Sequence, residues 1–200
     1  MPVIGITGGI STGKTTFSQC LRELAPDATF FDADQSARDL ADQDSEVRRL
    51  IEEEFGTAVY SSGHLNRGQI RTIVFADAEK KRALEQILHP RIRRQWSQQA
   101  ESRRNSTDLF FADIPLLYET GGETLCDRVV VVACSPSVQL ERLLVRTRLE
   151  KAAAEQMIAA QMPLTEKISR ADHVVWNNGG REVLVAQARL LIGLWQGVTA

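Results

Sequence analysis

The sequence lacks features that would by themselves assign it to a class of secreted or metal-binding proteins. Its 200 residues include only three cysteines, which show neither Cys-x-x-Cys spacing nor a framework of closely spaced pairs: Cys20, Cys126 and Cys134. Such usage is typical of a reducing compartment, and we expect a cytoplasmic location. The three histidines have no metal-ligand spacing among themselves, so the sequence does not predict a histidine metal centre.

Long apolar runs and a strong excess of one charge are also missing. No apolar stretch reaches the roughly 18 residues of a membrane span, and no basic segment with a long apolar run opens the chain. We therefore expect neither a signal peptide nor a membrane partner. The formal net charge of −2 does not indicate a nucleic-acid partner either. The length is typical of one α/β domain with small insertions.

Residues 3–16 hold the most informative pattern that is present. They begin with an apolar run over residues 3–6, which predicts a buried strand, and lead into a helical pattern that extends to Leu24. Between strand and helix stands Gly-x-x-x-x-Gly-Lys-Thr, at residues 8–15. This is the phosphate-binding loop pattern in the context it requires, so we predict a nucleoside-triphosphate site. The alternative is a glycine-rich turn at a helix start.

Each part of this loop has a chemical reason. Glycines let the backbone approach a phosphate closely, because no Cβ intrudes. Lys14 brings a positive charge to the outer phosphates, and the Thr15 hydroxyl is placed to bind Mg²⁺. Backbone N–H groups of the loop and of the first helical turn bind the anionic oxygens. The residues expected to bind ATP in these ways are Gly8, Ser11, Thr12, Gly13, Lys14, Thr15 and Thr16.

Four further apolar runs predict buried strands, at residues 28–31, 109–113, 128–134 and 172–176. Helical patterns separate these runs. Strands that are apolar on both faces belong to parallel sheets covered by helices. The sequence therefore predicts an α/β fold with a doubly wound, five-stranded parallel sheet, whose ligands bind at the carboxyl ends of the strands. Residues 45–104 are expected to form a helical insertion and residues 138–170 a helical lid. The expected nucleotide-binding core comprises residues 1–44, 105–137 and 171–200.

Local signals predict where several helices of the insertion begin and end. Ser45, Asn66 and Asp77 are expected to be N-caps. Pro90 is expected to kink or interrupt the last of these helices, which would end near Arg104.

Two motifs of GTPase switch proteins are absent. Asp113 is followed by Ile-Pro-Leu, so the glycine of Asp-x-x-Gly is missing, and no Asn-Lys-x-Asp motif occurs. A small kinase then fits best. It requires a base for the acceptor hydroxyl, a metal ligand, and cations for the transferred phosphoryl group.

Acidic and basic residues after the predicted strands could meet these requirements. Asp32 and Asp34 follow the second strand, which we expect beside the phosphate loop, and are candidates for the base; one of them could instead cap the next helix. Asp113 is a candidate for the Mg²⁺ shell, for substrate contact or for a helix cap. Arg142 and Arg146 share one helix face and suit a lid that clamps phosphates, with a solvated face as the alternative.

Several motifs occur together and in order over nearly the whole chain. They are Thr-Gly-Gly-Ile-Ser-Thr-Gly-Lys-Thr-Thr at 7–16, Asp-Ala-Asp at 32–34, His-Pro-Arg-Ile at 89–92, Asp-Ile-Pro-Leu-Leu-Tyr-Glu at 113–119, Ala-Gln at 160–161 and Ala-Asp-His-Val-Val-Trp-Asn-Asn-Gly at 171–179. In this combination the chain resembles the dephospho-CoA kinase family. The family usually has glycine where this chain has Ser11, and often arginine where it has Met157.

The resemblance implies transfer of the ATP γ-phosphoryl group to the 3′-hydroxyl of dephospho-CoA. It implies a nucleoside-monophosphate-kinase fold, with a CoA-binding helical insertion and a lid. By position, Asp32 would be the general base, Arg142 would reach the phosphates with Lys14, and Asn177 would lie by the adenine. The expected substrate contacts are Thr7, Asp34, His89 and Asp113. For His89 the alternative is a structural residue at a helix kink.

Other readings of function remain open from the residues alone. One is a P-loop kinase for another nucleoside or small alcohol, and another is an ATP-binding module that transfers nothing. We expect a monomer or a weak homo-oligomer.

Overall fold

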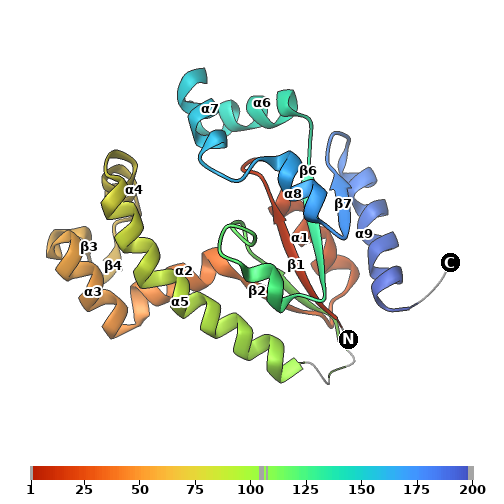
Figure 1. The fold of residues 1–200 in the computed structure, drawn as a ribbon, viewed down its shortest axis with the longest axis horizontal. Coiled ribbons are helices and arrows are strands. Elements are labelled where there is room, and N and C mark those ends of the chain that lie inside the picture. Colours follow the sequence, from red (N-terminus) through yellow and green to blue (C-terminus); the bar gives the residue numbers. More distant parts are fainter. Residues whose placement is uncertain (1, 104–105, 107, 198–200) are drawn as a thin grey trace. The chain divides into compact units, whose positions relative to one another are not determined.

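The central feature of the computed structural model, which describes residues 2–103, 106 and 108–197, is a five-stranded parallel sheet (Figure 1). Its strands are β1 (Val3–Gly8), β2 (Thr29–Asp32), β5 (Phe110–Asp113), β6 (Arg128–Ala133) and β7 (His173–Trp176). Every residue of β1 is buried, as expected for an interior strand covered on both faces. The predicted α/β fold is confirmed.

The order of the strands is β2-β5-β1-β6-β7, and it differs from expectation at one point. β2 was expected beside the strand that carries the phosphate loop, but β5 lies between them. β1 and β5 pair in parallel so that Ile6 stands opposite Asp113. The Thr29 N–H, at the start of β2, donates to the Leu109 carbonyl just before β5 at 2.9 Å. The acidic residue on the strand next to the loop strand is therefore Asp113, not Asp32.

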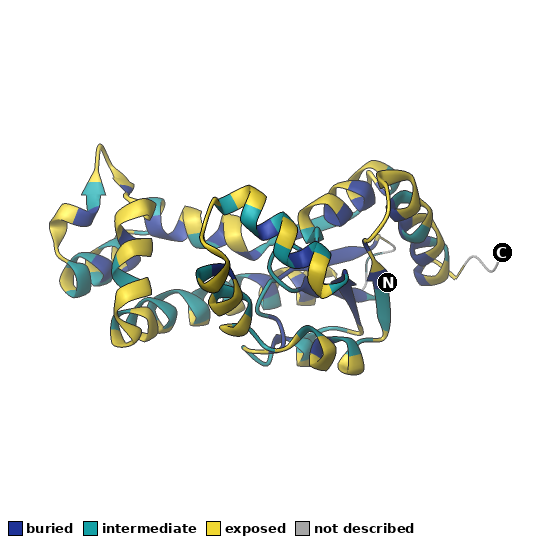
Figure 2. Cartoon of the chain, turned by 90° about the horizontal axis from the view of Figure 1, so that it is seen from above, coloured by how far each residue is buried: buried dark blue, intermediate teal, exposed yellow. Residues whose placement is uncertain are grey.

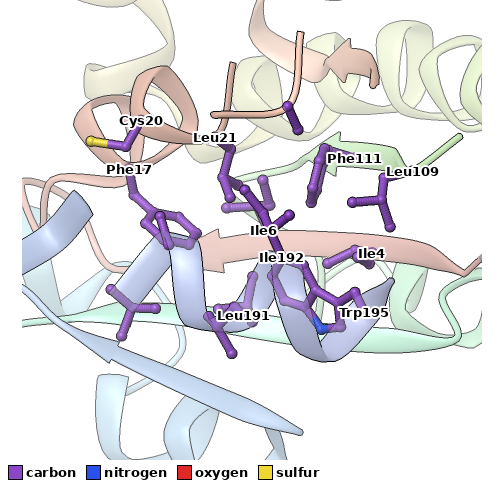
Figure 3. Close-up of a cluster of buried hydrophobic side chains, with 14 of the residues drawn as sticks. Ile4, Ile6, Phe17, Cys20, Leu21, Leu109, Phe111, Leu191, Ile192 and Trp195 are labelled. Atoms are coloured by element: carbon purple, nitrogen blue, oxygen red, sulfur yellow. The ribbon is translucent and has the colours of Figure 1, made fainter. Parts of the chain in front are cut away.

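Two helices, α1 (Lys14–Leu24) and α9 (Arg181–Trp195), pack together over the sheet and bury the main core (Figure 3). In α1 the apolar positions 17, 20, 21 and 24 follow the spacing of one helix face. The Phe111 ring of β5 stacks on Phe30 at 4.9 Å and meets the edge of Trp195 at 5.7 Å. In Figure 2 the strands are mostly dark blue, whereas the helices carry exposed outer faces.

The described chain divides into two compact units, Met1–Phe31 with Gln99–Ala200, and Asp32–Gln98. The first unit also contains the 3₁₀ helix η2 (Gly122–Leu125) and the helices α6 (Pro136–Thr147), α7 (Lys151–Ala159) and α8 (Leu164–Arg170). No helix among the described residues is long and apolar enough to span a bilayer.

The second unit consists of helices around a small core of its own. Its elements are α2 (Ala33–Gln43), α3 (Ser45–Phe55), η1 (Thr57–Val59), β3 (Tyr60–Ser61), β4 (His64–Leu65), α4 (Arg67–Ala76) and most of α5 (Ala78–Arg103). The expected insertion began at residue 45, but α2 already belongs to this unit. The reason is that Leu40 and Ala41 of α2 are buried with Val47 and Ile51 of α3.

Helix ends agree with the sequence except at two places. Asn66 and Asp77 cap α4 and α5 as predicted, by accepting N–H bonds from the following turn. α3 is capped by Asp44 rather than Ser45, because the Asp44 carboxylate accepts the N–H groups of the next two residues after Ser45. α5 runs through Pro90 without interruption. The predicted end at Arg104 lies outside the described residues.

Candidate active site

The phosphate-binding loop joins the carboxyl end of β1 to the start of α1. Gly13 has φ = +95°, a left-handed conformation that favours glycine, directly before the first residue of the helix. A Cβ at Gly8 would lie 2.5 Å from the Val132 carbonyl oxygen, so this loop packs tightly against β6. The first N–H groups of α1 have no acceptor within the helix. They form, with the loop, a place for an anion.

Lys14 and Asp113 form an ion pair at the base of the loop. Asp113 ends β5, is only 5% exposed, and accepts a second hydrogen bond from the Ser18 hydroxyl at 2.6 Å. Its carboxylate binds side chains of α1, so the structure excludes the alternative of a helix cap. Asp113 thus fixes the ammonium group of Lys14 beside the end of β5.

Arg142 and Asn177 bring two further polar side chains to the loop. The Asn177 amide donates to the Thr12 carbonyl at 2.9 Å. The Arg142 Nη1 atom is buried and has no hydrogen-bond partner in the described part of the chain. Burial raises the pKa of the neighbouring Cys134 thiol, and the Arg142 charge opposes that rise. The free Nη1 donor is suited to an anionic ligand, since a buried unpaired donor is costly.

A pocket of about 290 Å³ opens between these groups. It is lined by Gly13, Thr16, Arg142, Asn177, Gly179, Arg181 and Leu184. The loop, the helix α6 and the start of α9 therefore meet at one cavity, which joins residues more than a hundred positions apart. A ligand in it would lie against the positive end of α1.

The other predicted residues are engaged by neighbouring groups, exposed, or part of the second unit. Thr7 is fully buried and its hydroxyl donates to the Pro115 carbonyl at 2.9 Å, so it serves the interior and does not face a substrate. Arg146 is exposed on α6. Asp32, Asp34 and His89 belong to the second unit. Asp32, not Asp34, is the N-cap of α2, because it accepts the Gln35 N–H at 2.9 Å.

The sequence did not single out Lys167, whose side chain is fully buried in α8. Its ammonium group pairs with Glu119 at 2.8 Å and donates to the carbonyls of Pro115 and Gly8 at 3.0 and 3.5 Å. The contact with Gly8 ties α8 to the first residue of the phosphate loop. A lysine among polar helical residues gives no signal of burial, and only the fold reveals this role.

Comparison with known proteins identifies the family of the chain that carries this site. A family model described as dephospho-CoA kinase matches residues 2–182. The chain belongs to the dephospho-CoA kinase family. A dephospho-CoA kinase of Bacillus cereus is 39% identical over 195 residues, with 96% of each chain covered. One from Anaeromyxobacter dehalogenans is 44% identical over 200 residues, covering 98% of this chain and 94% of the relative.

A solved structure has a fold similar to that of this chain. The crystal structure of a Thermus thermophilus protein is 33% identical, covers 99% of this chain and 98% of its own, and superposes with a TM-score of 0.75. Since family membership rests on nearly the whole length, it covers the elements that carry both the loop and Arg142.

One side chain of the loop region could serve as a ligand for Mg²⁺ bound together with phosphates. Among the described residues no group of three or more histidine, cysteine or acidic side chains could hold a metal ion. Mg²⁺ commonly binds through one or two protein oxygens together with substrate phosphates. The exposed hydroxyl of Thr15, in the first turn of α1, is such an oxygen.

Proposed function

We propose that this protein transfers the γ-phosphoryl group of ATP to the 3′-hydroxyl of dephospho-CoA, which gives coenzyme A and ADP. The observation that carries the proposal is that the phosphate loop, through Gly13, and the unpaired Arg142 nitrogen meet at one pocket, in a chain of the dephospho-CoA kinase family. Lys14, the next residue after Gly13, is held by its ion pair with Asp113. Adenine would occupy the pocket beside Asn177, and the triphosphate would lie along the loop.

In the proposed reaction the acceptor oxygen forms a bond to the γ-phosphorus while the bond to the β-bridging oxygen breaks. The hydroxyl proton passes to the Asp32 carboxylate, and ADP leaves with the electron pair of the broken bond. Lys14 and Arg142 stabilise the negative charge on the phosphoryl oxygens. Support for Asp32 is its position at the carboxyl end of β2, the edge of a sheet where ligands of such folds bind.

The Thr15 hydroxyl would hold a magnesium ion, which would supply positive charge to offset the charge of the phosphates. The Asp113 carboxylate is engaged by Lys14 and Ser18, so we assign it to positioning Lys14 rather than to substrate contact.

We further propose that the second unit, with Asp34 and His89, binds the CoA moiety, and that residues 138–170 cover the phosphates as a lid. The protein would act in the cytoplasm as a monomer or weak homo-oligomer. Its free thiols Cys20, Cys126 and Cys134 are compatible with a reducing compartment.

The deciding experiment measures ADP release by a coupled assay with dephospho-CoA, adenosine, AMP or shikimate as acceptor. We expect acceptor-dependent turnover with dephospho-CoA, and at least tenfold lower kcat/KM with the others. Faster turnover with another acceptor would favour a different small-molecule kinase. ATP binding without any acceptor-dependent ADP release would favour a binding module.

A further inference from the structure

The tip of the phosphate loop is held from outside the loop by two glutamines. The Ile10 N–H donates to the side-chain oxygen of Gln161 at 2.8 Å. The Ile10 carbonyl accepts from the side-chain amide of Gln139 at 2.9 Å. Both backbone polar groups of one loop residue are therefore bound by side chains more than 120 positions away.

The two glutamines come from the segment expected to be the lid. Gln139 is the fourth residue of α6 and is only 5% exposed, whereas Gln161 follows α7 and is half-buried. A buried side-chain amide needs partners, and Gln139 finds one on the loop. The bonds link the loop directly to both ends of the segment that contains α6 and α7.

The absence of a side chain at Gly9 leaves room for the Gln139 amide. A Cβ on Gly9 would lie 2.7 Å from the Gln139 amide nitrogen, too close for the amide to stay. Ser11, on the other side of Ile10, has φ = +60°, in the left-handed region that favours glycine. The two glutamines thus bind Ile10, which stands between Gly9, where a side chain would displace the Gln139 amide, and Ser11, whose backbone is left-handed.

We propose that Gln139 and Gln161 are positioning residues for nucleotide binding, which hold the two peptide groups on either side of Ile10 so that the loop is already shaped for the triphosphate. A loop with fixed backbone groups loses less conformational freedom when a ligand binds. Both amides are neutral, so they act through loop geometry and leave the charge at the phosphates unchanged. This inference rests on the proposed ATP site but not on the identity of the acceptor.

Gln161→Ala and Gln139→Ala test the proposal by direct titration of ATP without acceptor. We expect each to raise the Kd for ATP about fivefold, the effect of one lost hydrogen bond, and the double variant to raise it further. The KM for dephospho-CoA should stay within twofold of the parent, and kcat should depend on pH in the same way as in the parent. The matched control is Gln156→Ala, an exposed glutamine of α7, which should leave the Kd for ATP unchanged.

A Kd for ATP within twofold of the parent in Gln161→Ala would overturn the proposal, and so would an equal loss in Gln156→Ala. If Gln139→Ala does not fold, Gln161→Ala decides alone, since its side chain is half-buried. Gly9→Ala gives a second check through a double-mutant cycle: it should displace the Gln139 amide, so its effect should not add to that of Gln139→Ala. Fully additive effects would count against Gln139. Turnover of the parent with dephospho-CoA separately tests the proposed function.

Discussion

Asp32 combines two roles in one side chain, since it caps α2 and is the proposed base. Asparagine caps a helix as well as aspartate but cannot accept the hydroxyl proton. We therefore expect Asp32→Asn to lower kcat by roughly 10²–10⁴-fold while the Kd for ATP and the midpoint of thermal unfolding change little. Coupled ADP release, nucleotide titration and a melting curve would measure the three quantities.

Asp44 provides the matched control, because it caps α3 through the same kind of carboxylate bond. Asp44→Asn should leave turnover as in the parent. If Asp32→Asn kept near-normal turnover at saturating substrate, Asp32 would be a cap only and the base would have to be sought elsewhere.

Single site residues were predictable where the whole motif that defines their role is contiguous in the sequence. Lys14 and Gly13 were identified because the loop motif, its strand and its helix are contiguous. Lys167 was not identified, and Gln139 and Gln161, although they belong to motifs of the resemblance, were given no role, since their partners at the loop lie 129 to 159 positions away. The Asp32 cap and the internal bond of Thr7 likewise depend on geometry that residue type does not reveal.

Helix α8 is anchored by a charged side chain rather than by an apolar stripe. The Lys167 ammonium group is fully buried against Glu119, Pro115 and Gly8. Loss of one partner of a buried pair leaves the other charge without compensation and costs about 3–5 kcal/mol. We expect Lys167→Met to lower the free energy of unfolding by about 3 kcal/mol, because Glu119 keeps some solvent contact. Urea denaturation measures this quantity.

The control for α8 is Lys151→Met, which removes an exposed pair with Glu155 on α7. It should shift the urea midpoint only slightly. The double variant Lys167→Met/Glu119→Leu should recover part of the lost stability, since a buried pair can be replaced by apolar side chains. If Lys167→Met and the parent had the same free energy of unfolding, the Lys167 ammonium group would not stabilise the position of α8.

The sequence predicted which segments form strands more reliably than it predicted which strands lie side by side. Five strands were found because each is an apolar run, whereas the two-residue strands β3 and β4 are too short to give a pattern. The strand order was wrong at β2, because sequence proximity does not show that β5 inserts beside β1. α5 continues through Pro90 although proline removes one helical bond, and the Arg91 side chain donates to the Ile87 carbonyl nearby.

The two units have separate cores, and this suggests that their functions can be separated by mutation. Ile51 is fully buried in the second unit among α2, α3 and their neighbours, whereas Leu191 packs in the core of the first. Truncation of a buried isoleucine or leucine to alanine costs about 2–5 kcal/mol. The damage should concentrate in the unit that contains the cavity, because local opening follows cooperative units.

Ile51→Ala should therefore raise the KM for dephospho-CoA several-fold, since we assign acceptor binding to the second unit, and leave the Kd for ATP within twofold of the parent. Leu191→Ala, the matched truncation, should weaken ATP binding as well. Hydrogen exchange should show faster exchange in α2 and α3 for Ile51→Ala, with β1 and β6 as protected as in the parent. If Ile51→Ala instead weakened ATP and dephospho-CoA binding equally, with faster exchange throughout, the units would not act separately. The cooperative unit would then be the whole chain, because a defect in one core would reach the phosphate loop as readily as the helices around it.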